Sequence, residues 1–322
     1  MTTQSNFVEQ VENRGITNDV VALVRHEGDL STSARLSTLK KGVDLIGGLG
    51  TLRSPFIVKP NVHTHRAWST TMFNNTSSKM VEAVINLALK ENQNLVVKIV
   101  ESDSTDKFIS PTWAEYGYKE LEDRLKKACI DASLVNLSEQ PLVSVPFNGI
   151  YFKEIELHKF LTEKGYFVSV AVPKTHPITF VTGVMKNMFG LLPRKTKGFY
   201  HRLEGSVNIN HVILDVINFI KPDLCILDAI VGMEGVTHGR PKRLNAMIVG
   251  RNPVSVDATM TRLMGFEPES ILHLVEGEKL GLGTLNPKII GESLENMTVK
   301  FKPPEHVLPM SLVNPPQQPS NR

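Results

Sequence analysis

Short apolar runs rich in β-branched residues alternate along the chain with segments whose apolar residues recur every three or four positions. The first pattern is typical of buried strands and the second of amphipathic helices. Strands are expected at residues 20–25, 55–60, 95–100, 166–172, 224–230 and 246–250. Because strands that alternate with helices usually form parallel sheets, the pattern predicts an α/β fold with a mostly parallel sheet and helices on both faces.

Four segments between the strands have the period of an amphipathic helix. The first follows Ser31, the second follows Thr76, the third extends over residues 111–128 and the fourth over residues 209–220. Ser and Thr are preferred at the residue that precedes a helix, so both are expected as N-caps. These helices are expected to pack their apolar stripes on the sheet.

Residues 145–152 carry an Asn-Gly pair between two apolar runs. Asn-Gly is the preferred pair for the two-residue type I′ turn of a β-hairpin. A hairpin is therefore expected there, which would make the sheet mixed.

The two ends of the chain differ from its middle. Residues 1–17 are polar, and the closing stretch holds six prolines, which cannot continue a helix or a central strand. We expect a flexible arm at residues 1–17, one domain of two closely packed α/β lobes at 18–302, and a Pro-rich tail at 303–322. A chain of 322 residues exceeds the roughly 250–300 residues at which one core stops growing.

Charge and cysteine content exclude several classes of protein. The chain has 36 basic and 33 acidic residues, an excess too small for a nucleic-acid partner. It begins without a signal peptide and has no apolar run of about 20 residues, so a cytoplasmic protein without a membrane partner is expected. Cys129 and Cys225 both lie in apolar patterns and are expected in the core, where they supply neither disulfides nor an iron-sulfur ligand set.

Polar residues follow the ends of five predicted strands, and ligands of α/β sheets bind beyond the carboxyl ends of strands. These five strand exits are therefore expected to converge on one site. In chain order the residues are Asn61, His63, His65 and Arg66; Glu101 and Asp103; Lys174 and His176; Asp228; and Arg251, Asn252 and Asp257.

Residues 171–202 hold many cations and no acid. Uncompensated cations beside apolar side chains indicate a pocket for an anion, because burying them unpaired is costly. The alternative is a surface loop of lysines that extend their charges into water. Lys186 lies between Met185 and Met188, and apolar surroundings would lower its pKa and suit a nucleophile or base. The full set is Lys174, His176, Lys186, Asn187, Lys195, Lys197, His201 and Arg202.

Two further segments carry weaker signals. Residues 232–243 contain three glycines and are expected to form a flexible loop able to bring backbone amides near a ligand. They match neither the dinucleotide fingerprint nor a P-loop. Asn252 and Pro253 are expected to begin a helix.

Three hypotheses follow. The first is an enzyme, an isomerase, lyase or hydrolase, that acts on a small carboxylate or phosphate through His176, Lys186 and His201 as catalytic residues. The second is a metal-dependent hydrolase that uses His63 and His65 as ligands. The third is a protein that binds the anion, or assembles with other proteins, without catalysis. No cofactor is assigned, and a homo-oligomer is a further expectation. The substrate-binding candidates are Lys174, Asn187, Asn61, Arg202 and Asp228.

The sequence resembles the family catalogued as domain of unknown function 362. The most specific likeness is a Lys-x-His step at residues 174–176, followed by the Lys186-Asn187 pair and the run FGLLP. Many members of that family carry iron-sulfur clusters, but this chain lacks the cysteines, so no cluster is expected. The similar segments are 57–62, 115–125, 170–193, 226–235 and 249–268.

A more distant likeness is to the N-terminal domain of the nickel-pincer lactate racemase family. There a lysine anchors a pyridinium-derived cofactor, and histidines act on the metal and as acid and base. The resemblance implies that His176, Lys186 and His201 occupy the corresponding positions, although Val184 and Met185 replace the family's glycine pair. It implies a shared scaffold and an anion pocket rather than nickel.

Overall fold

The structure is a computed structural model that describes residues 19–63, 71–104, 108–163, 165–236 and 238–305. The arm predicted at residues 1–17 and all but the first residues of the predicted tail lie outside this part of the chain, as do His65 and Arg66. The division of the domain into two lobes stays a prediction.

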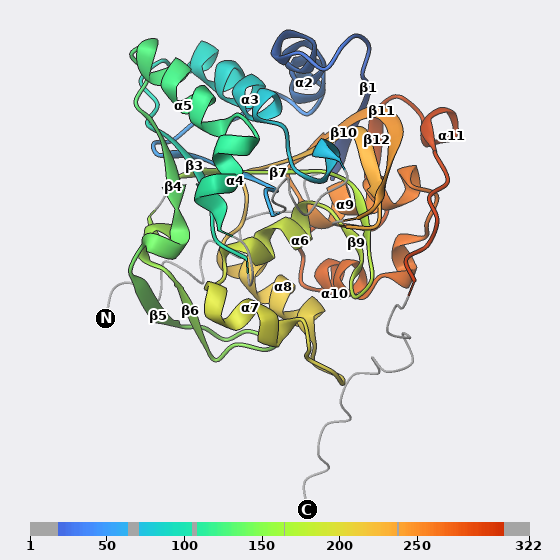
Figure 1. Cartoon of the computed structure of the whole chain (residues 1–322). Coiled ribbons are helices and arrows are strands. Elements are labelled where there is room, and N and C mark those ends of the chain that lie inside the picture. The colour runs from blue at the N-terminus through green and yellow to red at the C-terminus, as the bar shows by residue number, and fades with distance from the viewer. Residues whose placement is uncertain (1–18, 64–70, 105–107, 164, 237, 306–322) are drawn as a thin grey trace, which may run out of the picture.

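A ten-stranded sheet forms the centre of the molecule (Figure 1). Its main path runs β12-β1-β11-β10-β7-β2-β3-β4, and β8 and β9 extend it beside β10. All neighbours on this path pair in parallel except β11, which is antiparallel to both β1 and β10. The six predicted strands and the mixed, mostly parallel sheet are confirmed. The strands are β1 (Val20–Arg25), β2 (Phe56–Pro60), β3 (Val97–Glu101), β4 (Ala132–Asn136), β7 (Tyr166–Ala171), β8 (Lys174–His176), β9 (Phe180–Thr182), β10 (Leu224–Glu234), β11 (Arg240–Gly250) and β12 (Lys288–Gly291).

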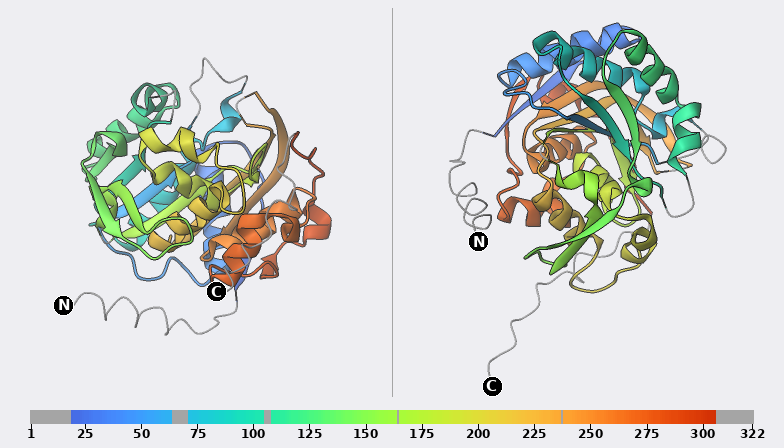
Figure 2. Two further views of the ribbon diagram at one scale, coloured as in Figure 1. Left: turned by 90° about the horizontal axis from the view of Figure 1, so that it is seen from below. Right: turned by 90° about the vertical axis from the view of Figure 1, so that its left-hand side faces the viewer.

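Helices cover both faces of the sheet, as Figures 1 and 2 show. Side chains of a strand alternate between faces, so Ala22 packs in the cluster with α2 to α5 and Leu23 packs in the cluster with α6 to α11. The helices are α2 (Thr32–Leu45), α3 (Ser78–Glu91), α4 (Ile109–Glu115), α5 (Tyr118–Lys127), α6 (Val184–Met188), α7 (Arg194–Tyr200), α8 (Ile209–Phe219), α9 (Pro253–Leu263), α10 (Leu272–Lys279) and α11 (Leu294–Met297).

Helix boundaries agree with the sequence in part. Ser31 caps α2 as expected, and its side chain accepts a hydrogen bond from the Ala34 amide. The cap of α3 is Ser77 rather than Thr76. The helix predicted over residues 111–128 is two helices, because Gly117 adopts a positive φ of 75° between α4 and α5. Within the described residues, no helix is both long and apolar enough to cross a lipid bilayer.

The predicted hairpin exists, but its turn was wrongly assigned. The antiparallel pair β5 (Leu142–Pro146) and β6 (Glu154–His158) is joined by residues 147–153 and forms a separate small sheet. Neither Asn148 nor Gly149 has the positive φ that a type I′ turn requires. The connection is held instead by Asp215 of α8, whose carboxylate accepts hydrogen bonds from three successive amides of residues 150–152.

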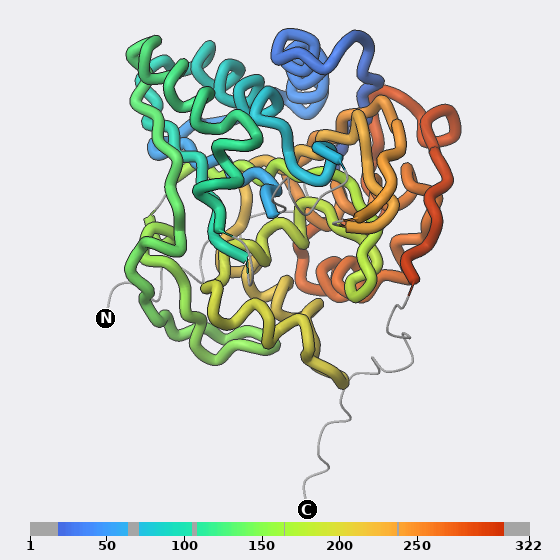
Figure 3. Tube along the Cα trace, viewed as in Figure 1, coloured from blue at the N-terminus to red at the C-terminus, as the bar shows by residue number. Residues whose placement is uncertain are grey.

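The glycine-rich segment is mostly strand rather than a flexible loop. β10 continues to Glu234, which pairs with Arg240 of β11, and Met233 pairs with Lys174 of β8. Figure 3 shows the trace of β8 and β9 beside this extension. The small side chain of Gly232 permits the packing, since a Cβ there would lie 3.0 Å from the carbonyl oxygen of Pro173.

One cysteine prediction is confirmed and the other is wrong. Cys225 is buried in β10, whereas Cys129 is exposed. Cys129 lies just beyond α5 with a φ of 59°, and its amide donates to the carbonyl of Lys126. It therefore ends the helix at the surface instead of packing inside.

Candidate functional site

The strands β2 and β3 end side by side and carry a buried ion pair. Lys59 lies one residue before the end of β2, and Glu101 is the last residue of β3. The Nζ atom of Lys59 is 2.8 Å and 2.7 Å from the two carboxylate oxygens of Glu101, and both side chains are almost fully buried. Lys59 also donates to Asn187 of α6 at 3.1 Å. The parallel strand ends thus converge with the helix that holds the predicted site.

Lys174 connects β8 with the segments that follow β2. Its ammonium donates to Asn61 Oδ1 and to the carbonyl of Asn74, and lies 3.4 Å from His63 Nε2. The side chain is fully buried. Because an ammonium has three donors, these contacts occupy Lys174 fully. Lys174 and Asn61 therefore bind each other, and their role toward a substrate stays a prediction.

Lys197 of α7 joins three chain segments in a similar way. Its ammonium donates to Ser102 Oγ, to the Asp103 carbonyl at 2.8 Å and to the Gly190 carbonyl at 2.9 Å. The alternative interpretation, a surface loop of lysines, fits Lys195, which is exposed and pairs with Glu156 on β6 at 2.9 Å. It does not fit Lys174 or Lys197, which are buried.

Lys186 differs from these lysines. Its Nζ atom lies 4.1 Å from the centroid of the Phe189 ring, one turn further along the chain. Among the described residues, no oxygen or nitrogen acceptor binds its ammonium. The side chain is half-buried. Lys186 is therefore the lysine of this group whose donors are available to a ligand.

Burial lowers the pKa of Lys174, Lys186 and Lys197 to about 7 in each case. Burial also lowers the pKa of Lys59, although the carboxylate of Glu101 raises it. The charges of Lys197 and Lys59 lower the pKa of Lys186 further. An unpaired ammonium in this environment is destabilised, and an anion would stabilise it.

His176 and His201 lie near Lys186 and have opposite tautomers. The amides of Ile178 and Thr179 donate to His176 Nδ1, so the neutral ring carries its proton on Nε2. In contrast, His201 Nδ1 is 2.8 Å from the Lys197 carbonyl, which can only accept, so its free lone pair is on Nε2. The ring centroids are 6.3 Å apart. One ring therefore offers a donor and the other an acceptor.

Both histidines stay neutral at ordinary pH. Burial lowers the pKa of His201 to about 4, and the charge of Lys186 lowers it further. Burial, followed by the charges of Lys186 and His201, places the pKa of His176 well below its usual value. Phe189 packs edge-on against His201, with centroids 4.9 Å apart, and so separates the ring from water on that side.

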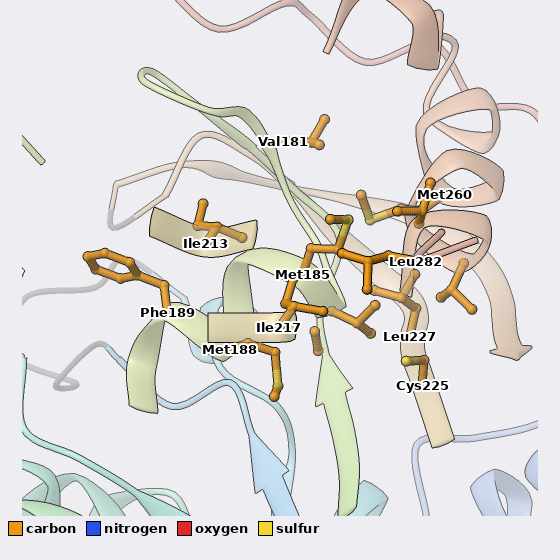
Figure 4. Close-up of a cluster of buried hydrophobic side chains, with 14 of the residues drawn as sticks. Val181, Met185, Met188, Phe189, Ile213, Ile217, Cys225, Leu227, Met260 and Leu282 are labelled. Carbon is orange, nitrogen blue, oxygen red and sulfur yellow. The ribbon is translucent and has the colours of Figure 1, made fainter. Parts of the chain in front are cut away.

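The short helix α6 is held from both sides. Figure 4 shows Met185 and Met188 in a cluster of buried apolar side chains that also contains Ile217 and Leu227. At its start, the carboxylate of Asp257 in α9 accepts hydrogen bonds from the Val184 amide at 2.8 Å and the Met185 amide at 2.9 Å. Burial raises the pKa of Asp257 to about 7, although these two hydrogen bonds lower it. Lys186 is thus presented on a fixed backbone.

Gly183 allows the carboxylate of Asp257 to reach α6. A Cβ at residue 183 would lie 2.2 Å from Asp257 Oδ1. We expect Gly183→Ala to lower the free energy of unfolding by about 1–3 kcal/mol, measured by urea unfolding. In the Asp257→Ala background the same change should cost much less, because the clashing carboxylate is gone. Equal costs in both backgrounds would show that this contact does not hold α6.

One residue near Lys186, His273, was missed by the sequence analysis because it lies far along the chain. His273 of α10 is fully buried, and its Nδ1 donates to Asn210 Oδ1 at 2.9 Å. The Nδ2 atom of Asn210 donates to Asn208, which fixes this orientation. His273 Nε2 has no hydrogen-bond partner within the described residues. Burial and the charge of Lys186 lower the pKa of His273 to about 3.

Other predicted site residues lie apart from this group. Asp228 pairs with Arg35 of α2 at 3.2 Å, and both are buried. Arg202 is exposed after α7. The fifth strand exit lies at the opposite end of the strands, because β11 runs antiparallel, and of its predicted residues Asp257 reaches the site, at the start of α6. Beyond β11, Arg251 donates to the carbonyls of Gly48 and Leu49.

The metal hypothesis finds no support in the described part of the chain. His63 is described and contacts Lys174, and a neighbouring cation opposes metal binding. His65 lies outside the described residues. No group of three or more His, Cys, Asp or Glu side chains in the described ranges is arranged to hold a metal ion.

Comparisons with known proteins place the chain in a family and give it distant relatives. The family model described as Domain of unknown function (DUF362) matches residues 57–262, which confirms the resemblance expected from the sequence. A thylakoid-associated protein of Synechocystis sp. is 25% identical over 166 residues, which are 49% of this chain and 52% of that protein. The chain thus spans about half the length of this relative.

Among solved structures, the lactate racemase apoprotein of Thermoanaerobacterium thermosaccharolyticum is similar with a TM-score of 0.44 and 9% identity. The similarity covers 70% of this chain and 54% of the racemase chain.

Proposed function

Since the chain belongs to the DUF362 family, whose description assigns no activity, we propose from its own residues that it is an enzyme acting on a small carboxylate or phosphate. One observation carries the proposal: Lys186 holds an ammonium in apolar surroundings with no acceptor bound to it. An anionic ligand would supply that acceptor and offset the charge. The reaction would be an isomerisation, a lyase reaction or a hydrolysis.

The two histidines give the site a direction for proton transfer. His201 Nε2 has a free lone pair and is the candidate base, while His176 Nε2 carries a proton and is the candidate donor. A substrate anion would oppose the charge of Lys186 and so raise the pKa of His201 toward the useful range. A substrate between the rings could then lose a proton on one side and be polarised on the other.

The remaining predicted residues have supporting roles in this proposal. Asn187 donates to the Lys59 carbonyl and to Ser169, and its side-chain oxygen accepts from Lys59 Nζ. These bonds fix Asn187 and so position Lys186, the residue before it. Lys174 and Asn61 hold the chain after β2 against β8. Arg202 is proposed to meet a second charge of the ligand at the surface, whereas Asp228, which lies apart from Lys186, is proposed to hold Arg35 rather than to contact the anion.

The proposal is tested by the pH dependence of sulfate binding. The pKa of Lys186 is about 7 in the folded protein, whereas an unfolded lysine titrates near 10.4. The folded protein without a ligand therefore loses the Lys186 proton above pH 7. An anion that binds the ammonium must be accompanied by uptake of that proton. Because sulfate keeps its charge between about pH 6 and about pH 9, its affinity should fall by about tenfold per pH unit above pH 7. Isothermal titration calorimetry measures this.

Lys195→Met is the matched control, because Lys195 is exposed and paired with Glu156. It should bind sulfate with the same pH dependence as the natural chain. An affinity that does not change above pH 7, or no binding at any pH, would contradict the proposal. A ligand that copurifies and is never turned over would favour the non-catalytic alternative. The charged or titratable groups around Lys186 and its helix are Lys59, Glu101, Asp103, Lys174, His176, Lys197, His201, Asp257 and His273.

A further inference from the structure

Lys186 is the one lysine of the buried group that no hydrogen bond holds, within the residues that the structure describes. Lys59 is fixed by Glu101, and Lys174 and Lys197 each bind a set of uncharged acceptors. The Lys186 amine lies over the face of Phe189 instead, 4.1 Å from the ring centroid. A nitrogen free of acceptors can lose its proton and use its lone pair, which the other three lysines cannot do without breaking contacts.

We propose that Lys186 is a nucleophile that forms an imine with an anionic aldehyde or ketone, such as a 2-oxo acid. This inference rests on the proposed anion-binding function and names its substrate class. Its geometric basis is the amine without an acceptor, set beside two histidines of opposite tautomer. A desolvated lysine next to other cations is the usual form of an amine nucleophile.

The environment favours the neutral amine that this reaction needs. Burial lowers the pKa of Lys186 to about 7, and Lys197 and Lys59 lower it further. About half of the Lys186 amines are then neutral at pH 7, compared with on the order of one in a thousand for an exposed lysine. The difference makes Lys186 selectively reactive at neutral pH.

The two histidines fit the steps of imine formation. The nitrogen lone pair of Lys186 forms the C–N bond while the carbonyl π electrons move to oxygen, which His176 Nε2–H stabilises by a hydrogen bond. His201 Nε2 takes one proton from nitrogen and returns it to oxygen, which gives the carbinolamine. A second proton follows the same route, the hydroxyl leaves as water, and a C=N bond remains. One amine and one carbonyl thus give one imine and one water.

The charges nearby select an anionic carbonyl compound. When the imine nitrogen takes up one proton from water, a positive charge returns to the nitrogen of Lys186, among the cations of Lys59, Lys174 and Lys197. Of the two buried carboxylates beside them, Glu101 is already paired with Lys59, and Asp103 accepts a hydrogen bond from the Ile109 amide and acts on Lys197. A carboxylate next to the carbonyl would supply the missing counter-charge, whereas an uncharged aldehyde would not.

Reductive trapping in the natural chain tests the inference. The full-length protein is incubated at pH 7 with glyoxylate and sodium cyanoborohydride, digested, and mapped by peptide mass spectrometry. We expect the reduced adduct at Lys186 to exceed that at the exposed Lys195 by about 10²-fold or more. Acetaldehyde, an uncharged aldehyde of similar size, should label Lys186 far less than glyoxylate does.

The outcomes separate this inference from the function on which it rests. Labelling of Lys186 no greater than that of Lys195, in protein that binds sulfate, would overturn the imine and leave anion binding intact. If the natural chain neither binds sulfate nor is labelled at Lys186, both the imine and the anion-binding function are overturned. Equal labelling by acetaldehyde would overturn the anionic substrate class. Because the adduct is mapped in the natural chain, the result does not depend on a variant that folds.

Discussion

Replacing Lys59 with methionine is expected to lower the free energy of unfolding by about 3–5 kcal/mol. The change leaves the Glu101 carboxylate, which is only 4% exposed, without its counter-charge. The amides of Val62 and Ser102 still donate to it, but two hydrogen bonds do not replace an ammonium at 2.7 Å. Urea unfolding followed by circular dichroism measures the loss.

A double variant separates the charge from the packing. Adding Glu101→Leu to Lys59→Met removes both buried charges and should recover much of the lost stability, because a buried ion pair can often be replaced by apolar residues. Lys195→Met breaks the exposed pair with Glu156 and should cost less than about 1 kcal/mol. An unchanged unfolding midpoint for Lys59→Met would show that Glu101 is not held as an anion by this lysine.

Lys186→Met is expected to weaken sulfate binding by about 10²-fold or more while the fold stays intact. The ammonium that would bind the anion is lost, and charge-assisted hydrogen bonds are the strong contacts of such a site. The free energy of unfolding should stay the same or rise by about 1–4 kcal/mol, because a buried cation without a partner is replaced by an apolar side chain. Calorimetry and urea unfolding measure the two effects.

Two results would contradict the role of Lys186 as the anion-binding residue. If Lys186→Met binds sulfate like the natural chain, the anion is held elsewhere. If the variant loses several kcal/mol of stability, the ammonium has a structural role like that of Lys174 or Lys197. Lys186→Arg is the conservative companion, since it keeps a positive charge and should retain part of the binding while it abolishes trapping by glyoxylate.

Local patterns were enough to predict most of the sheet. Each of the six predicted strands is a buried apolar run, and burial on both faces makes such runs visible without knowledge of their neighbours. The strands of this sheet that were missed are short, as β8 and β9 are, or lie at an edge, as β4 and β12 do, and no residue of β12 is fully buried. The glycine-rich segment was misread because Gly232 serves close packing between strands rather than a turn.

The candidate site was predicted as a region, but its internal contacts were not. The lack of acids in residues 171–202 pointed to buried cations, yet the acid that pairs with one of them, Glu101, comes from another strand. Lys59 carried a signal that was overlooked, since it is the one charged residue of β2, a strand buried along its whole length. Asp257 was predicted at a strand exit, but its bonds to α6 were not, and His273 carried no signal, because partners 73 and 63 positions apart leave no local pattern.

The carboxylate that caps α6 also fixes when the site can assemble. Asp257 reaches the Val184 amide across 73 residues of chain, and α9 follows the whole of β10 and β11. During synthesis on the ribosome, the lysine-bearing helix would therefore emerge long before its anchor. An excised fragment ending before α9 would keep Lys186 in its sequence and lose the rigid backbone that aims it.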